Sequence, residues 1–180
     1  INLVSQLSPD ELGRGVITAS TGNHGQSIAY AAGIFGAEAV IVVPEGANPG
    51  KVESIRNLGA KVVFHGRVFE DAREHVERLA GEEGYRDIHS ANEPRLIAGV
   101  GTYTLEIIED LPDVDVIIVA VGGGSGACGA CIVAKAIEPR IQVIGVQAAG
   151  APAAYLSWKD GRVVEASVET VAEGLATRMG

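Results

Sequence analysis

A glycine-rich run at residues 121–126, with the sequence VGGGSG, is the part of the chain best suited to binding an anion. It follows the most apolar stretch of the sequence and precedes an alanine-rich segment, so we expect a strand to lead through it into a helix. Consecutive glycines let backbone N–H groups approach an anion closely, and the start of a helix adds partial positive charge. The run therefore predicts a phosphate site, with a tight turn that binds no ligand as the alternative.

A second polar run occupies residues 19–26, with the sequence ASTGNHGQ, and also lies where a strand is expected to end and a helix to begin. Its hydroxyl, amide and imidazole groups can donate hydrogen bonds, as can the backbone N–H groups of a helix start. These donors converge on whatever anion binds there. The alternative is that Ser20 and Asn23 only cap the helix.

The positions of both runs follow from an expected alternation of strands and helices. Short runs rich in Val and Ile predict strands at residues 15–19, 39–43, 61–64, 114–121 and 142–146. Helix-period patterns lie between them, and a longer helix is expected over residues 93–111. Such alternation with short connections indicates crossover units and parallel sheets, that is, an α/β protein.

Capping residues set the expected helix boundaries. Asn48 followed by Pro49 predicts a helix start, as does the segment 68–71. Gly36 and Gly59 stand where helices end, a position where glycine takes the left-handed conformation at little cost. The first three strands form one set and the last two another, so we expect two lobes that meet near residues 91–99. A cleft between lobes is a usual place for a cofactor.

The composition narrows the class of partner. The 180 residues carry a formal net charge of −9 and no cluster of Lys or Arg, which argues against a nucleic-acid surface because phosphate neutralisation needs clustered cations. The sequence has no run of about 18 apolar residues for a membrane span and no signal peptide pattern at its start. We therefore expect a cytoplasmic protein with a small-molecule partner. The start at Ile1 instead of Met predicts an internal fragment.

Together, the Ser-x-Gly-Asn-His-x-Gln run and the glycine-rich run about a hundred residues later resemble the β-family, or fold type II, of pyridoxal-phosphate (PLP) enzymes. Within it they are similar to the threonine/serine dehydratase and serine racemase group. The resemblance extends to VPE at residues 43–45, EP at 93–94, IAG at 97–99 and GLA at 174–176. It implies three-layer αβα lobes with parallel sheets, the tryptophan synthase β-like architecture, here incomplete. It also implies a small lobe at residues 16–95, with residues 1–15 and 96–180 in a large PLP-binding lobe.

The resemblance implies PLP as the cofactor and assigns roles to both runs. It implies that Asn23 hydrogen-bonds the phenolic oxygen of PLP. The residues implied to hold the cofactor phosphate are Gly122, Gly123, Gly124, Ser125 and Gly126. Those implied to bind the carboxylate of an amino-acid substrate are Ser20, Thr21, Gly22 and His24. Thr21 lies where racemase relatives carry a catalytic serine, so its hydroxyl is also a candidate acid or base.

The implied activity is that of a PLP-dependent ammonia-lyase, which removes water from threonine or serine and yields a 2-keto acid and ammonia. Relatives are usually dimers or tetramers, so a homo-oligomer is expected. The alternatives are an amino-acid racemase of the same group, a non-catalytic fragment and a nucleotide-dependent oxidoreductase. Residues 124–129 fit the dinucleotide pattern G-x-G-x-x-G, although Gln147 stands where that fold wants an acidic residue.

The chain departs from the family at the lysine that binds PLP. In the family this lysine precedes the Ser-x-Gly-Asn-His run, whereas the first lysine here is Lys51. We therefore expect the PLP lysine in an upstream segment, and expect this chain alone to be inactive. Racemase-type relatives bind a cation through acidic residues, but the corresponding positions hold Gln147 and Ala153, and no metal site is predicted.

The two cysteines and the three histidines other than His24 are expected to be structural or exposed. Cys128 and Cys131 supply only half of a typical zinc ligand set, so they are predicted to be small packing residues. His65, His75 and His89 show no metal-ligand spacing and are expected at the surface or in loops.

Overall fold

The computed structural model describes residues 1–20 and 22–179. The chain divides into two compact units, residues 1–93 and 94–180. The first unit contains η1 (Val4–Gln6), α1 (Pro9–Arg14), β1 (Val16–Ala19), α2 (Asn23–Phe35), β2 (Ala39–Val43), α3 (Pro49–Asn57), β3 (Lys61–Phe64), α4 (Phe69–Glu83) and β4 (Arg86–Asp87). The second contains α5 (Pro94–Asp110), β5 (Val116–Ala120), α6 (Ser125–Ile137), β6 (Gln142–Val146), α7 (Ala153–Asp160) and η2 (Glu173–Leu175). All five predicted strands are present, which confirms the α/β fold.

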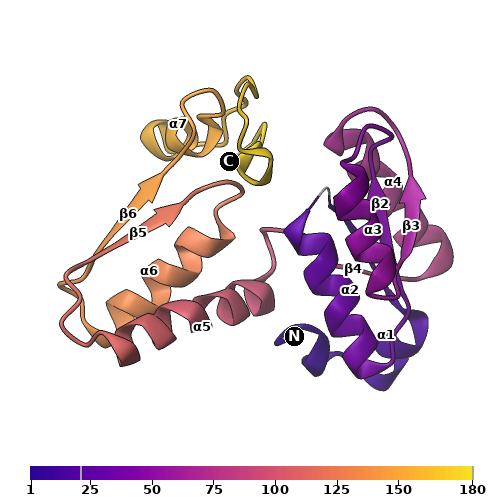
Figure 1. Ribbon diagram of the computed structural model, residues 1–180, viewed down its shortest axis with the longest axis horizontal. Helices are drawn as coiled ribbons and strands as arrows, with labels where there is room; N and C mark the ends of the chain where they lie inside the picture. The colour runs from indigo at the N-terminus through magenta and orange to yellow at the C-terminus, as the bar shows by residue number, and fades with distance from the viewer. Residues whose placement is uncertain (21, 180) are drawn as a thin grey trace. The chain divides into compact units, whose positions relative to one another are not determined.

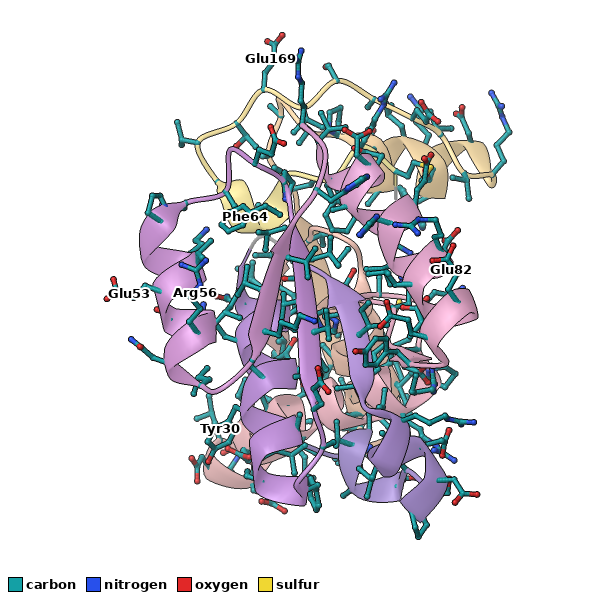
Figure 2. All side chains as sticks on the ribbon, turned by 90° about the vertical axis from the view of Figure 1, so that its right-hand side faces the viewer. Tyr30, Glu53, Arg56, Phe64, Glu82 and Glu169 are labelled. Carbon is teal, nitrogen blue, oxygen red and sulfur yellow. The ribbon has the colours of Figure 1, made fainter. Side chains whose placement is uncertain are left out.

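The first unit is a four-stranded parallel sheet in the order β3-β2-β1-β4 with helices on both faces. Figure 2 shows α3, which carries Arg56, on one side of the strands and α4, which carries Glu82, on the other. Every residue of β1 and β2 is buried, because parallel strands between two helix layers have both faces covered. This arrangement confirms the three-layer architecture and fixes where β1 ends.

The short strand β4 was not predicted, because two residues are too few to show a hydrophobic pattern. It pairs with β1, with Val16 opposite Arg86 and Ile17 opposite Asp87. The guanidinium of Arg73 in α4 donates to both carboxylate oxygens of Asp87, at 2.8 and 2.6 Å, and so ties α4 to this strand. β4 therefore brings the backbone after Asp87 alongside the end of β1.

The predicted helix boundaries in the first unit are confirmed. The side chain of Asn48 caps α3 by accepting a hydrogen bond from the Gly50 N–H at 3.0 Å. Gly36 and Gly59 have φ of 68° and 87°, the left-handed region in which a side chain is strained. Asn48 thus marks the start of α3, and Gly36 and Gly59 mark the ends of α2 and α3.

The second unit has two parallel strands, β5 and β6, and Figure 1 shows α5 and α6 side by side along one side of them. Ile117 and Val119 of β5 are buried against α6, whereas Val116 and Ile118 are exposed. The backbones of α5 and α6 touch at two glycines: a Cβ on Gly129 would lie 2.9 Å from the Gly101 nitrogen. α6 is thus held in place by a contact that only glycine permits.

Residues 1–15 belong to the first compact unit of this structure. The assignment of residues 1–15 together with 96–180 to one larger lobe stays a prediction about the family architecture. None of the helices in residues 1–20 and 22–179 has both the length and the apolar character needed to cross a membrane.

Candidate functional site

Ser20 follows the end of β1, and its side chain is used within the fold. It is buried, and its Oγ accepts hydrogen bonds from the N–H groups of Gly25 at 2.9 Å and Gly22 at 3.2 Å. The hydroxyl therefore caps the first turn of α2, as the structural alternative for this residue predicted. Its own proton remains able to donate to a further acceptor, so substrate binding by Ser20 stays a prediction.

His24 lies in the first turn of α2 with its ring turned toward the sheet. The Nε2 atom is 3.0 Å from the Oγ1 of Thr18, and that hydroxyl donates to the Ile88 carbonyl at 2.7 Å. With its proton so placed, the Thr18 oxygen accepts from the Nε2–H of a neutral imidazole. Burial lowers the pKa of His24 to about 4. His24 is therefore uncharged at neutral pH, and the ring anchors the loop to β1 and β4.

Asn23 is the first residue of α2, and it is exposed. The backbone N–H groups of Asn23 and His24 lie in the first turn, where an α-helix has no carbonyl to accept from them. An exposed carboxamide and two amide donors thus meet at this helix start, which suits an anion or a polar ring oxygen. Thr21, predicted to bind substrate and to act as acid or base, lies outside the described residues.

Lys51 lies beside this loop, a neighbour that the sequence analysis missed. It is half-buried in the first turn of α3, and its Nζ is 3.8 Å from the point where a Cβ on Gly22 would sit. Because α3 follows β2, which is the neighbour of β1, its first turn lies at the same edge of the sheet as the start of α2. The sequence did contain a signal for this neighbour. Lys51 begins the helix after the second predicted strand, just as the loop at Ser20–His24 follows the first.

The glycine-rich run forms the turn from β5 into α6 in the second unit. Gly124 has φ of 91°, in the left-handed region, and immediately precedes the first residue of α6, Ser125. The first helical hydrogen bond runs from the Cys128 N–H to the Gly124 carbonyl at 2.9 Å. The N–H groups of Ser125, Gly126 and Ala127 precede that bond and are donors at the helix start. This donor set fits a phosphate group.

Two segments distant in the sequence make contacts with the glycine-rich turn. A Cβ on Gly122 would lie 3.2 Å from the Gly174 carbonyl oxygen, so η2 packs directly against the turn. The hydroxyl of Tyr103 in α5 donates to the Gly126 carbonyl at 3.1 Å. Neither residue was predicted to act here, because both contacts join segments that are far apart in the sequence.

Gln147 at the end of β6 uses its carboxamide to start the next helix. Its Oε1 accepts a hydrogen bond from the Tyr155 N–H at 2.9 Å, while Ala153, the first residue of α7, is buried. Over residues 1–20 and 22–179, the structure brings no three His, Cys, Asp or Glu side chains together as a metal cluster. The absence of a metal site in the working enzyme stays a prediction.

Cys128 and Cys131 are both exposed, so the prediction that they are small packing residues is wrong. The buried face of α6 is formed instead by Gly129, Ala130 and Ala134, which lie against α5 and the strands. The small side chains in this helix therefore divide between two faces, which the composition alone did not show.

Two of the remaining histidines come together in the first unit. The rings of His65 and His75 stack with centroids 3.8 Å apart, in a hollow of about 560 Å³ beside Glu45 and Arg78. Burial, His65 and Arg78 lower the pKa of His75. The Nδ1 atom of His89 accepts from the Ala91 N–H at 3.0 Å, which stabilises a turn. The stacking of His65 on His75 was not predicted, because the two residues lie on different elements.

Comparison with known proteins finds relatives that match nearly the whole chain. The sequence matches the family described as pyridoxal-phosphate dependent enzyme over residues 1–179. It is 43% identical over 178 residues to an L-threonine ammonia-lyase of Thermotoga maritima, covering 98% of this chain and 44% of that protein. It is 35% identical over 180 residues to a serine racemase of Arabidopsis thaliana, covering 99% of this chain and 54% of the racemase.

A solved structure shows the same fold. The processed form of threonine deaminase isoform 2 from Solanum lycopersicum matches with a TM-score of 0.94 and 37% identity, covering 99% of this chain and 52% of that one. The chain spans about half the length of the curated relatives it matches. These proteins are relatives of the chain, and their activities are properties of longer molecules.

Proposed function

Because the chain belongs to the family of pyridoxal-phosphate-dependent enzymes, we propose that it forms part of an ammonia-lyase acting on L-threonine or L-serine. The observation that carries the proposal is the turn from β5 into α6, in which left-handed Gly124 presents the amide groups of a helix start. The threonine ammonia-lyase and threonine deaminase relatives support this substrate class.

The phosphate of the cofactor is the proposed ligand of this turn. The residues that hold it are Gly122, Gly123, Gly124, Ser125 and Gly126. Backbone N–H groups donate to phosphate oxygens, the hydroxyl of Ser125 adds a further donor, and the partial positive charge of the helix start favours the anion. The backbone N–H groups at the start of α6 are hydrogen-bond donors of the type that phosphate oxygens accept from.

The start of α2 is the proposed site for the rest of the cofactor and for the substrate. The exposed carboxamide of Asn23 donates to the phenolic oxygen of PLP. The substrate carboxylate binds to the loop formed by Ser20, Thr21, Gly22 and His24, where amide donors orient the amino acid. His24 contributes through its position and its backbone N–H, because its neutral ring is already bonded to Thr18. The hydroxyl of Thr21 is the candidate acid or base.

The reaction eliminates one water across the Cα–Cβ bond of the amino acid and takes up one water when the resulting imine is hydrolysed, so the net products are a 2-keto acid and ammonia. When bound, PLP supplies the electron sink that stabilises the negative charge formed as the α-proton leaves. The loops of this chain fix the substrate so that the reacting bonds stay aligned with the ring. The lysine that binds PLP is proposed to come from a segment preceding Ile1 in a longer protein, since Lys51, the first lysine here, lies beyond the loop.

The working enzyme is proposed to be a cytoplasmic homo-oligomer, a dimer or tetramer. Residues 16–95 are proposed as its small lobe, with residues 1–15 and 96–180 contributing to the large PLP-binding lobe. An oxidoreductase built on the glycine-rich turn does not fit the family to which the chain belongs.

A longer protein that carries this chain and a preceding lysine provides the test. Incubation with L-threonine is expected to release ammonia and 2-oxobutanoate in equal amounts, and the protein is expected to show the visible absorption of a PLP–lysine imine. The 180-residue chain by itself is expected to show neither. A longer protein that binds PLP but releases no ammonia from L-threonine or L-serine would refute the lyase function.

Racemisation is the second candidate, because the Arabidopsis thaliana relative is a serine racemase. The same incubation distinguishes the two reactions when the amino acid that remains is separated by chirality. Accumulation of D-serine without a matching amount of ammonia would identify a racemase.

A further inference from the structure

Cys128 and Cys131 lie three residues apart on α6, and they are the two cysteines of the sequence. Residues at this spacing lie on the same face of an α-helix, with Cβ atoms about 5–6 Å from each other. Both side chains are exposed, so a small molecule in solution can reach either thiol. The proposed function assigns no role to this pair, whose placement suits thiol–disulfide exchange.

A disulfide between the two cysteines is within reach but does not fit a regular helix. Cα atoms three residues apart in an α-helix are separated by about 5 Å, inside the range of about 4.4–6.8 Å seen in disulfides. The Cβ atoms, however, must approach to about 3.5–4.5 Å. Closing the bond therefore requires the backbone near one cysteine to move by about 1–2 Å.

The middle of α6 is held too closely to supply this movement. Gly129 lies between the two cysteines and is buried. A Cβ on Gly129 would lie 2.9 Å from the Gly101 nitrogen and 3.0 Å from the Ile97 carbonyl oxygen, so the backbones of α5 and α6 already touch there. Ala134, three residues beyond Cys131, is also buried. Cys131 is thus fixed by packing, and the movement falls to Cys128.

Cys128 is held by the hydrogen bond that begins α6. Its N–H donates to the Gly124 carbonyl at 2.9 Å. The residues between them are Ser125, Gly126 and Ala127, whose N–H groups belong to the donors proposed to hold the cofactor phosphate. A single hydrogen bond gives way more readily than a close-packed backbone contact. Displacement of Cys128 would therefore disturb the first turn of α6 before any other part of the helix.

We propose that Cys128 and Cys131 form a thiol–disulfide switch that controls the affinity of the α6 start for the cofactor phosphate. The oxidant is a low-molecular-weight disulfide of the glutathione class. One cysteine thiolate attacks it, forms a mixed disulfide and releases one small thiol; the other cysteine then displaces the second small thiol and closes the Cys128–Cys131 bond. The protein loses two electrons and two protons, which the two released thiols carry. The effect on the cofactor rests on the proposed function, whereas the formation of the disulfide does not.

The coupling between disulfide and cofactor acts in both directions. Loss of one hydrogen bond to a charged phosphate is expected to weaken the binding of PLP about tenfold. By linkage, bound PLP must favour the dithiol over the disulfide by the same factor. A tenfold change corresponds to about 30 mV for a two-electron couple, so PLP is expected to raise the midpoint potential of the cysteine pair by about this amount.

The test uses the longer protein that carries this chain, equilibrated in glutathione buffers of defined ratio with and without PLP. Trypsin cleaves after Arg95 and Lys135, so one peptide, residues 96–135, contains both cysteines. A disulfide within this peptide removes the mass of two hydrogen atoms and blocks the alkylation of both thiols. Mass spectrometry then gives the midpoint potential, and titration with PLP gives the affinity of the reduced and oxidised proteins.

Amide hydrogen exchange tests the movement of the helix start without the cofactor. The Cys128 amide is expected to exchange faster in the oxidised protein, because its bond to Gly124 is disturbed. Amides of α4, which belongs to the first unit, should be unchanged. Cys131→Ser is the matched control: it retains Cys128 but cannot close the bond. Its affinity for PLP and its amide exchange should not depend on the glutathione ratio.

Each outcome decides one question. A peptide that stays reduced in excess glutathione disulfide overturns the switch. A disulfide that forms without faster exchange of the Cys128 amide, or without weaker binding of PLP, overturns the control of the cofactor site. Faster exchange in a protein that binds no PLP in either state would support the movement of the helix start and refute the cofactor site. Weaker PLP binding in a protein that releases no ammonia would support the switch and refute the lyase reaction alone.

Discussion

Replacing Ser20 by alanine should destabilise the start of α2 by a predictable amount. The buried hydroxyl accepts from the N–H groups of Gly25 at 2.9 Å and Gly22 at 3.2 Å, and alanine leaves both donors without this acceptor. Loss of a capping hydroxyl costs about 0.5–2 kcal/mol, and burial places this site in the upper half of that range. We expect a loss of about 1–2 kcal/mol, which corresponds to a roughly 5- to 30-fold change in the local opening equilibrium.

Amide hydrogen exchange is the suitable assay, because it reports on α2 separately from the second unit. In Ser20→Ala the amides of Gly25 and Gln26 should exchange faster by the factor given above. Ser27→Ala is the matched control: Ser27 lies in the same helix, is exposed and donates to the Asn23 carbonyl at 2.9 Å. Alanine is a better helix former there, so exchange should be unchanged or slower. Unchanged exchange in Ser20→Ala would show that its hydroxyl does not cap the helix.

Three other predictions concern packing, helix propensity and pH. Gly129→Ala places a Cβ 2.9 Å from the Gly101 nitrogen, a backbone atom, so α5 must shift; urea denaturation should show a loss of about 1–3 kcal/mol, and a stabilised variant would contradict the contact. Gly81→Ala in α4 meets nothing within 4 Å and should stabilise by about 0.5–1 kcal/mol. The pKa of His24 falls from its ordinary 6.5 to about 4 on folding, so the unfolded chain takes up the proton first as pH falls. Its share of stability, at most about 3 kcal/mol, is present above pH 6.5 and lost toward pH 4. The urea midpoint of His24→Gln should therefore depend less on pH across this window, and an equal dependence would refute the shift.

The sequence alone was sufficient for the five longer strands, for the starts of α3 and α4, and for the positions of the two loops. Residues 39–43, 61–64 and 142–146 form strands with the predicted bounds, because runs of Val and Ile between helical patterns suit buried parallel strands. The glycine-rich run was recognisable because consecutive glycines before a helix have few structural uses. These features depend on neighbours in the chain, and their signals are local.

The sequence could not show what each loop residue contacts. The capping bonds of Ser20, the anchoring of His24 by Thr18, and the approach of Lys51 to Gly22 all depend on which strands become neighbours. The prediction for Cys128 failed for the same reason, because only the packing of α5 on α6 determines which face of the helix is exposed.

Residue types and their spacing thus determined the α/β fold and the positions of the two loops proposed to bind anions, since strand and helix signals are carried by adjacent residues. The tertiary structure decided which donors in those loops are already engaged and which cation lies beside them. Hydrogen bonds and charges act through space over a few ångströms, and the sheet brings together groups that the sequence separates by tens of residues.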